Sequence, residues 1–228
     1  MVLLGFENKR HYTMSEHETS APITTEHKIT YLALGDSYTI GESVPLESNF
    51  PCQLSARLNS NGLDVGKPRI IAVTGWTTSE LQAAIEVEAL KQKFGLVTLL
   101  IGVNNQYRGE SLEVYRKEFK ELLQTAVDFA GGIKAHVFVV SIPDWGVTPY
   151  GLSSGRDLQA VANEIDAFNA INKEETLAAG VSYTDITPGS RRASTAPDLV
   201  ATDGLHYSAK MHGEWVDSLT PAILKALK

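Results

Sequence analysis

Short apolar runs alternate with longer segments of helical periodicity along most of this chain, and this alternation constrains its fold more than any other feature. Residues 99–101 and 137–140 are continuously apolar, which is typical of strands that helices cover on both faces. The order predicts an α/β domain, a flavodoxin-like three-layer α/β/α sandwich with about five parallel strands. We expect strands at residues 29–34, 69–73, 96–101, 136–142 and 181–185, and helices at 46–59, 78–94, 111–129, 158–179 and 209–227.

The first residues differ from the rest in being polar and without sustained periodicity. We interpret residues 1–27 as a mobile N-terminal leader and residues 28–228 as the folded domain, with Met14 a possible natural start. A secretory signal needs an apolar core of about 7–15 residues behind a basic start, which this leader lacks. No apolar run approaches the roughly 18 residues of a membrane span. These features favour a cytoplasmic protein without a membrane span.

Charge and side-chain chemistry exclude several other classes. The formal net charge of -7 argues against sequence-independent binding of nucleic acid. The adjacent pair Arg191-Arg192 is interpreted as part of a solvated loop. Cys52 is the only cysteine, so no internal disulfide can form. The histidines lack zinc-type spacing, so we expect no metal and no cofactor, with His136 at a strand edge and His212 on a helix surface.

Five chemistry-bearing residues fall in the connections that follow expected strands. Ser37 follows the first strand, Gly75 the second and Asn104 the third, while Asp203 and His206 lie between the last strand and the final helix. Ligands of such sheets bind beyond the carboxyl ends of the strands, so these residues should converge there. A serine hydroxyl becomes a good nucleophile when an imidazole takes its proton and a third group orients that imidazole.

Each of these pieces has a simpler explanation when it is taken alone. A Gly-Asp-Ser run is a common turn, and Asp36 can act merely as a helix cap. Gly75 can end a strand, and Asn104 can begin a helix in any α/β protein. Their joint occurrence, in this order and at successive strand ends, is what favours a catalytic site.

These residues also carry a resemblance to a known family. A Gly-Asp-Ser run ending at Ser37, then Gly75, Asn104 and an Asp-Gly-Leu-His block from Asp203 to His206, resembles the signature blocks of the GDSL-like, or SGNH, hydrolases. The resemblance implies a metal-independent serine esterase or acylhydrolase that cleaves a small-molecule ester through an acyl-serine intermediate. It also implies a triad of Ser37, His206 and Asp203. The oxyanion hole would comprise the backbone amides of Ser37 and Gly75 and the side-chain amide of Asn104.

The chain departs from the family's pattern at three positions. Tyr38 stands where leucine often follows the serine, Val73 replaces an asparagine two residues before the glycine, and Asn105 replaces an aspartate. None of these changes removes a proposed catalytic group. Val73 and Asn105 alter the hydrogen bonding around the expected oxyanion hole.

Other interpretations of the chain differ in function. The run from Gly151 to Gly155 matches the G-x-S-x-G pattern of other hydrolases, but no strand leads into it, so Ser153 is interpreted as a loop residue. A non-catalytic carbohydrate- or lipid-binding module on the same scaffold is the leading alternative. A nucleotide or phosphate binder would require a glycine-rich loop where Asp36 stands.

The substrate is less constrained than the reaction. Pocket shape decides between lipid, carbohydrate O-acetyl and thioester substrates, and we expect a short or medium acyl ester. The aromatic residues Tyr38, Trp76, Trp145 and Tyr150 either line the pocket or only pack loops against the sheet, and the sequence leaves both open. It likewise gives no indication of oligomeric state.

Overall fold

A twisted parallel sheet organises the chain. The computed structural model describes residues 29–228, so the leader expected at residues 1–27 lies outside the described residues. Within them, five parallel strands form one sheet in the order β2-β1-β3-β4-β5. The strands are β1 (Tyr31–Gly35), β2 (Arg69–Ala72), β3 (Leu96–Leu100), β4 (Val137–Val140) and β5 (Ser182–Thr184).

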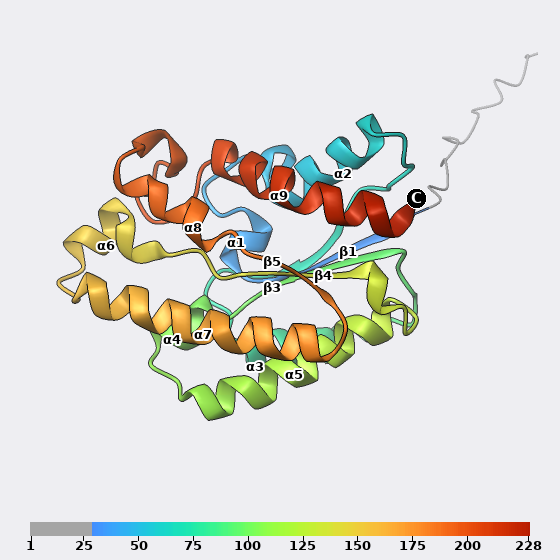
Figure 1. Ribbon diagram of the computed structural model, residues 1–228, viewed down its shortest axis with the longest axis horizontal. Helices are drawn as coiled ribbons and strands as arrows, with labels where there is room; N and C mark the ends of the chain where they lie inside the picture. Colours follow the sequence, from blue (N-terminus) through green and yellow to red (C-terminus); the bar gives the residue numbers. More distant parts are fainter. Residues whose placement is uncertain (1–28) are drawn as a thin grey trace, which may run out of the picture.

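Helices cover the sheet on both faces, which confirms the expected three-layer α/β/α fold (Figure 1). On one face lie α2 (Phe50–Ser60) and α9 (Ala209–Leu227); on the other lie α3 (Thr78–Glu88), α5 (Leu112–Phe129) and α7 (Leu158–Ala178). Shorter helices join them: α1 (Ser37–Ile40), α4 (Val103–Tyr107), α6 (Pro149–Ser153) and α8 (Thr187–Ser190), with 3-10 helices η1 (Leu46–Ser48), η2 (Lys134–His136), η3 (Trp145–Val147), η4 (Arg191–Ser194) and η5 (Pro197–Leu199).

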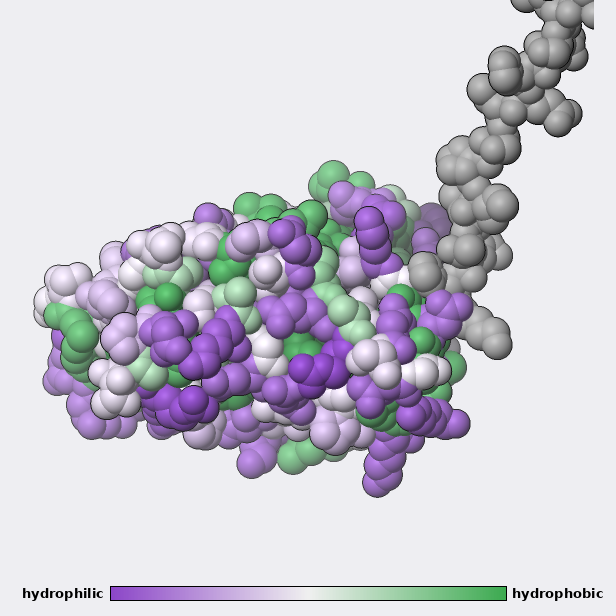
Figure 2. Space-filling model, turned by 90° about the horizontal axis from the view of Figure 1, so that it is seen from above, coloured by the Kyte–Doolittle hydropathy of each residue, from purple (hydrophilic) through white to green (hydrophobic). Residues whose placement is uncertain are grey.

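The core lies between the sheet and these helices. Every residue of β1, β3 and β4 is buried, because both faces of these strands are covered. Helix α5 turns Tyr115, Phe119 and Leu122 inward at helical spacing. Figure 2 views the molecule from the side of α2 and α9, where hydrophilic residues spread over the surface with apolar ones scattered among them. The apolar faces of the helices are therefore largely used in covering the sheet.

Two helices differ in length from the sequence expectation. The helix expected at 78–94 ends at Glu88, because Ala89 adopts a left-handed conformation with φ of 47° and caps it. The helix expected at 46–59 begins only at Phe50, where the side chain of Asn49 accepts a hydrogen bond from the Cys52 amide. The thiol of Cys52 is only partly buried.

Two expectations about single residues were wrong. His136 ends the 3-10 helix η2 and does not belong to a strand. His212 is buried at 1% exposure, and its ring stacks on Trp215 with centroids 4.6 Å apart. The buried face of α9 is wide enough to include both Met211 and His212. Burial lowers the pKa of His212 to about 3, so this imidazole is neutral at pH 7.

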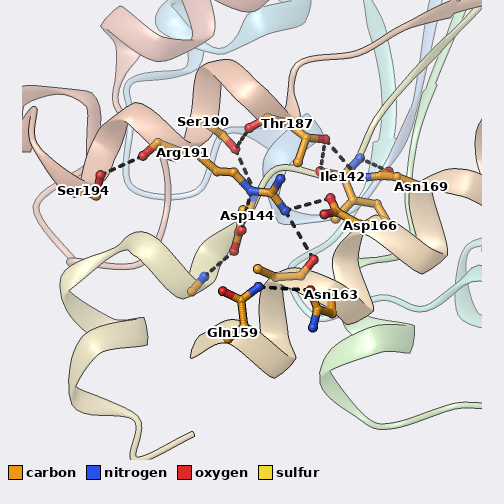
Figure 3. A network of polar contacts seen from close by, with 12 residues as sticks. Ile142, Asp144, Gln159, Asn163, Asp166, Asn169, Thr187, Ser190, Arg191 and Ser194 are labelled. Atoms are coloured by element: carbon orange, nitrogen blue, oxygen red, sulfur yellow. Dashed lines mark hydrogen bonds and ion pairs between the residues drawn. The ribbon is translucent and has the colours of Figure 1, made fainter. Parts of the chain in front are cut away.

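Arg191 also differs from the expectation of a solvated loop. It lies in η4 and forms ion pairs with Asp144 at 2.8 Å and Asp166 at 2.7 Å (Figure 3). The Asp144 side chain is 1% exposed and also accepts a hydrogen bond from the Gly146 amide. The backbone amide of Asp144 donates to the Ser190 hydroxyl. This network holds the segment that carries Trp145 against the carboxyl edge of the sheet.

We predict that Arg191→Met will lower the free energy of unfolding by about 3 kcal/mol, because it leaves the buried carboxylate of Asp144 without its cation. Arg192→Met is the matched control, since Arg192 pairs with Glu214 at an exposed position. We expect the control to cost at most about 1 kcal/mol. Urea unfolding of the three proteins measures both values, and equal losses in the two variants would contradict the role given to Arg191.

Candidate active site

The turn from β1 into α1 places Ser37 at the carboxyl edge of the sheet. A Cβ on Gly35 would lie 2.1 Å from Thr39 Oγ1 and 2.3 Å from the Leu100 carbonyl oxygen, so only glycine fits this tight connection. The next residue, Asp36, caps α1 by accepting a hydrogen bond from the Tyr38 amide at 3.0 Å. Ser37 is then the first residue of the helix, where backbone amides have no partner within the helix.

Asp36 is a cap with an unusual environment. Its side chain is fully buried, and its second oxygen, Oδ2, has no hydrogen-bond partner among the described residues. Burial raises the pKa of Asp36 to about 7, against the lowering effect of the Tyr38 amide. The carboxyl group directly before Ser37 is thus largely protonated in mildly acidic solution.

Asp203 and His206 form one compact turn. The Asp203 Oδ1 atom accepts hydrogen bonds from the amides of Leu205 and His206, both at 2.9 Å. The other oxygen, Oδ2, lies 2.6 Å from His206 Nδ1. The three-residue spacing therefore lets one carboxylate both close the turn and orient the imidazole.

Ser43 is a further partner that the sequence analysis missed. Its hydroxyl donates to Asp203 Oδ2 at 2.7 Å, and its backbone has a φ of 65°, which is uncommon for a residue other than glycine. Burial alone would raise the pKa of Asp203, but hydrogen bonds from the His206 ring, the Leu205 amide and Ser43 lower it well below its usual range. Nothing in the sequence around Ser43 signals this contact, which joins segments 160 residues apart.

The loop after β2 is held by α4. Gly75 has a φ of 90°, and its carbonyl accepts a hydrogen bond from Arg108 Nη2 at 2.6 Å. The side-chain amide of Asn104 donates to the Trp76 carbonyl at 2.9 Å. Asn105, one of the departures noted above, accepts from the Thr78 amide. These bonds fix the position of Gly75 relative to Asn104.

One cavity of about 230 Å³ lies where these elements meet. Three of the expected site residues border it, namely Ser37, Asn104 and His206, whereas Gly75 and Asp203 lie outside its lining. Among the described residues no hydrogen bond joins the Ser37 hydroxyl to the His206 ring, and such contacts often tighten only when substrate binds. The rest of the lining is Tyr38, Val103, Tyr107, Trp145, Tyr150 and Leu205.

The aromatic residues that the sequence singled out have different surroundings. Tyr38, Trp145 and Tyr150 border the cavity, while Trp76 borders a separate groove beside β2. Sequence reasoning missed Tyr107, which also lines the cavity. It lies on α4, a five-residue helix too short to show periodicity.

The rival serine lies away from this cavity. Ser153 is in α6, not in a loop as expected, and its exposed hydroxyl donates to the Tyr150 carbonyl at 3.0 Å. The segment before it is the 3-10 helix η3, not a strand. The arrangement required by the G-x-S-x-G motif is therefore absent from this part of the chain.

The described residues include neither a cluster suited to a metal ion nor a helix suited to a membrane. In residues 29–228, no three His, Cys, Asp or Glu side chains are grouped closely enough to hold a metal ion. None of the helices in that range has the length and apolar character needed to cross a membrane.

Comparisons with known proteins place the chain among hydrolase folds. The model of the GDSL-like Lipase/Acylhydrolase family matches residues 33–213. A sequence search of curated proteins finds no match. The structure of TesA resembles the chain with a TM-score of 0.68 at 17% identity, covering 87% of this chain and 99% of TesA. The structure of a lipase/acylhydrolase from Enterococcus faecalis has a TM-score of 0.66 at 18% identity, covering 88% of this chain and 97% of that protein. The structure of the acetyl xylan esterase AlAXEase has a TM-score of 0.66 at 16% identity, covering 86% of this chain and 100% of that protein. At these identities the likeness to solved structures is one of fold.

We predict that Asp36→Asn will gain stability relative to the native protein as the pH rises from about 4 to 7. Over this range the folded native protein keeps the Asp36 proton while the unfolded chain has lost it, so rising pH favours unfolding. Asparagine has no proton to lose. The difference in free energy of unfolding should therefore grow by up to about 4 kcal/mol, with no further growth well above pH 7. Urea unfolding at each pH tests this, and a flat or falling difference would refute it.

Proposed function

This chain belongs to the GDSL-like Lipase/Acylhydrolase family, and we propose that it is a serine esterase that hydrolyses carboxylic esters through an acyl-serine intermediate. The observation that carries the proposal is the shared cavity of Ser37, Asn104 and His206. Asp203 stands behind the imidazole, bound to its Nδ1 atom. A nucleophile, a base, an orienting carboxylate and an amide donor are the groups that acyl transfer to water requires.

In the proposed reaction, His206 is the general base. The contact between its Nδ1 and Asp203 Oδ2 assigns the ring proton to Nδ1, which leaves Nε2 free to accept the proton of the Ser37 hydroxyl. The Ser37 oxygen then attacks the ester carbonyl, and the protonated imidazole returns the proton to the leaving alcohol. Water hydrolyses the acyl-serine by the same steps, and Asp203 stabilises the imidazolium in each.

The oxyanion of the tetrahedral intermediate needs hydrogen-bond donors that are in place before the reaction. The Ser37 amide, as the first amide of α1, has no partner within the helix. Asn104 has two side-chain N–H groups, of which one donates to the Trp76 carbonyl and the other remains for the substrate. The Gly75 amide completes the proposed oxyanion hole, with Arg108 fixing the loop through the Gly75 carbonyl.

The alternative of a non-catalytic carbohydrate- or lipid-binding module predicts a different outcome for the same experiments. Such a module would bind a ligand in the cavity without turnover, and its Ser37 hydroxyl would have no chemical role. The presence of every proposed catalytic group supports the interpretation as an enzyme, because a protein that no longer catalyses the reaction does not need to keep these groups. A cytoplasmic location stays a prediction from the sequence.

We predict that Ser37→Ala will lower kcat for p-nitrophenyl ester hydrolysis by about 10⁴-fold or more, because the nucleophile is removed. Ser153→Ala is the matched control, since that hydroxyl is exposed and lies outside the cavity. We expect the control to keep native kinetics. Turnover that persists without Ser37, after the purified protein is shown to be free of contaminating esterase, would refute the proposed mechanism.

A second prediction concerns the oxyanion hole. Asn104→Ala should lower kcat by about 10²- to 10³-fold with little change in KM, because the lost hydrogen bond acts mainly in the transition state. Steady-state kinetics on one ester separates the two constants. A rise in KM with unchanged kcat would instead assign Asn104 to substrate binding.

A further inference from the structure

Three aromatic side chains form one continuous wall of the cavity beside Ser37. We call Tyr107, Trp145 and Tyr150 the aromatic wall. The hydroxyl groups of Tyr107 and Tyr150 are 2.7 Å apart and share a hydrogen bond, which joins α4 to α6. The ring of Trp145 lies behind them, with centroids 5.4 Å from Tyr107 and 6.0 Å from Tyr150. The wall is thus contributed by separate segments that meet at one hydrogen bond.

Other contacts hold the aromatic wall in place. The Trp145 indole N–H donates to Gln106 Oε1 at 2.8 Å, and the ring is buried. The guanidinium of Arg156 lies 4.4 Å above the Tyr107 ring and donates to the Tyr107 carbonyl at 2.9 Å. The Tyr150 amide donates to the Gly204 carbonyl at 2.8 Å. This last bond ties the wall to the turn that presents His206.

The size of the cavity limits what can enter it. At about 230 Å³ the cavity is smaller than the roughly 300–1,000 Å³ of sites that take drug-sized ligands, so only a short acyl chain fits beside the catalytic groups. A longer chain would have to pass the aromatic wall.

From this geometry we propose that the Tyr107–Tyr150 pair closes the acyl end of the cavity and restricts the enzyme to short acyl chains. This inference rests on the proposed function and adds its substrate class. Tyr107 and Tyr150 are specificity-determining residues in this proposal and take no part in the chemical steps.

The order of the reaction assigns the cavity to the acyl group. The alcohol accepts its proton from His206 and departs first, so it needs an open path to solvent. The acyl group stays bonded to Ser37 until water attacks, so a pocket beside Ser37 suits it. The lining beyond the catalytic groups is apolar or aromatic and includes Val103 and Leu205, as an alkyl chain requires.

The test compares two substrate series in the native protein and in Tyr150→Ala and Tyr150→Phe. In the first series the alcohol is p-nitrophenol and the acyl chain runs from acetyl to decanoyl; in the second the acyl group is acetyl and the alcohol runs from ethanol to decanol. Leu152→Ala is the control, because Leu152 is exposed on the same helix and lies outside the cavity. Thermal unfolding confirms that each variant is folded.

We expect native kcat/KM to fall by about tenfold or more between the short and the long acyl chains of the series, since one methylene in excess already costs that much in a fitted pocket. Tyr150→Ala should abolish this fall in the acyl series and leave the dependence on chain length in the alcohol series unchanged. The control should match the native protein. If only Tyr150→Ala hydrolyses the longer acyl chains, the ring of Tyr150 closes the cavity. If Tyr150→Phe hydrolyses them too, the hydrogen bond between the Tyr107 and Tyr150 hydroxyls contributes to the closure as well.

Other outcomes of the same experiment would contradict either this inference or the proposed function. An acyl profile that is unchanged in Tyr150→Ala overturns the inference, and so does a shift confined to the alcohol series. In both cases hydrolysis that still depends on Ser37 leaves the proposed function standing. A native protein that hydrolyses no ester of either series would instead overturn the proposed function, and this inference with it.

Discussion

The close approach of the backbone at Gly35 is the constraint on which the candidate site depends. Because this position has no side chain, the chain turns from strand β1 directly into α1 against the Leu100 carbonyl of the neighbouring central strand β3. That turn brings the hydroxyl and the free amide of Ser37 to the carboxyl edge of the sheet. The loops after β2 and β3 end at the same edge because all strands run parallel, so the remaining groups need only short connections to reach it.

Three carboxyl groups near this edge have the same chemistry but different environments. Asp36 is buried with one oxygen unpartnered, so burial dominates and its pKa rises. Asp203 receives several hydrogen bonds that favour its ionised form, so its pKa falls. Asp144 is buried beside the guanidinium of Arg191. The first therefore serves as a cap that is largely neutral in mildly acidic solution, the second as the charge that orients His206, and the third as an anchor for the segment that carries Trp145.

The two sides of the cavity are built differently, and under the proposed function they would have different tasks. The wall that holds Ser37, Asn104 and His206 is built on strand ends and bound by backbone hydrogen bonds, so it suits chemistry that tolerates little movement. The aromatic wall comes from short helices joined by a hydroxyl pair at a partly exposed position. Under the proposed function, changes to these side chains would alter the volume open to substrate, while the Tyr150 amide keeps its bond to the Gly204 carbonyl.

The sequence by itself determined the parallel sheet, because strands such as 96–101 and 137–140 carry a local apolar pattern that the structure confirms. It also placed Ser37 and Asn104 after strands and His206 between the last strand and the final helix, and these three border one cavity. Local pattern could not indicate helices as short as α4, the inward turn of His212 or the ion pairs of Arg191, since each depends on what faces it. Only the tertiary structure decided that Ser43 reaches Asp203 and that Tyr107 meets Tyr150, because these pairs join residues far apart in the chain and periodicity carries information only about near neighbours.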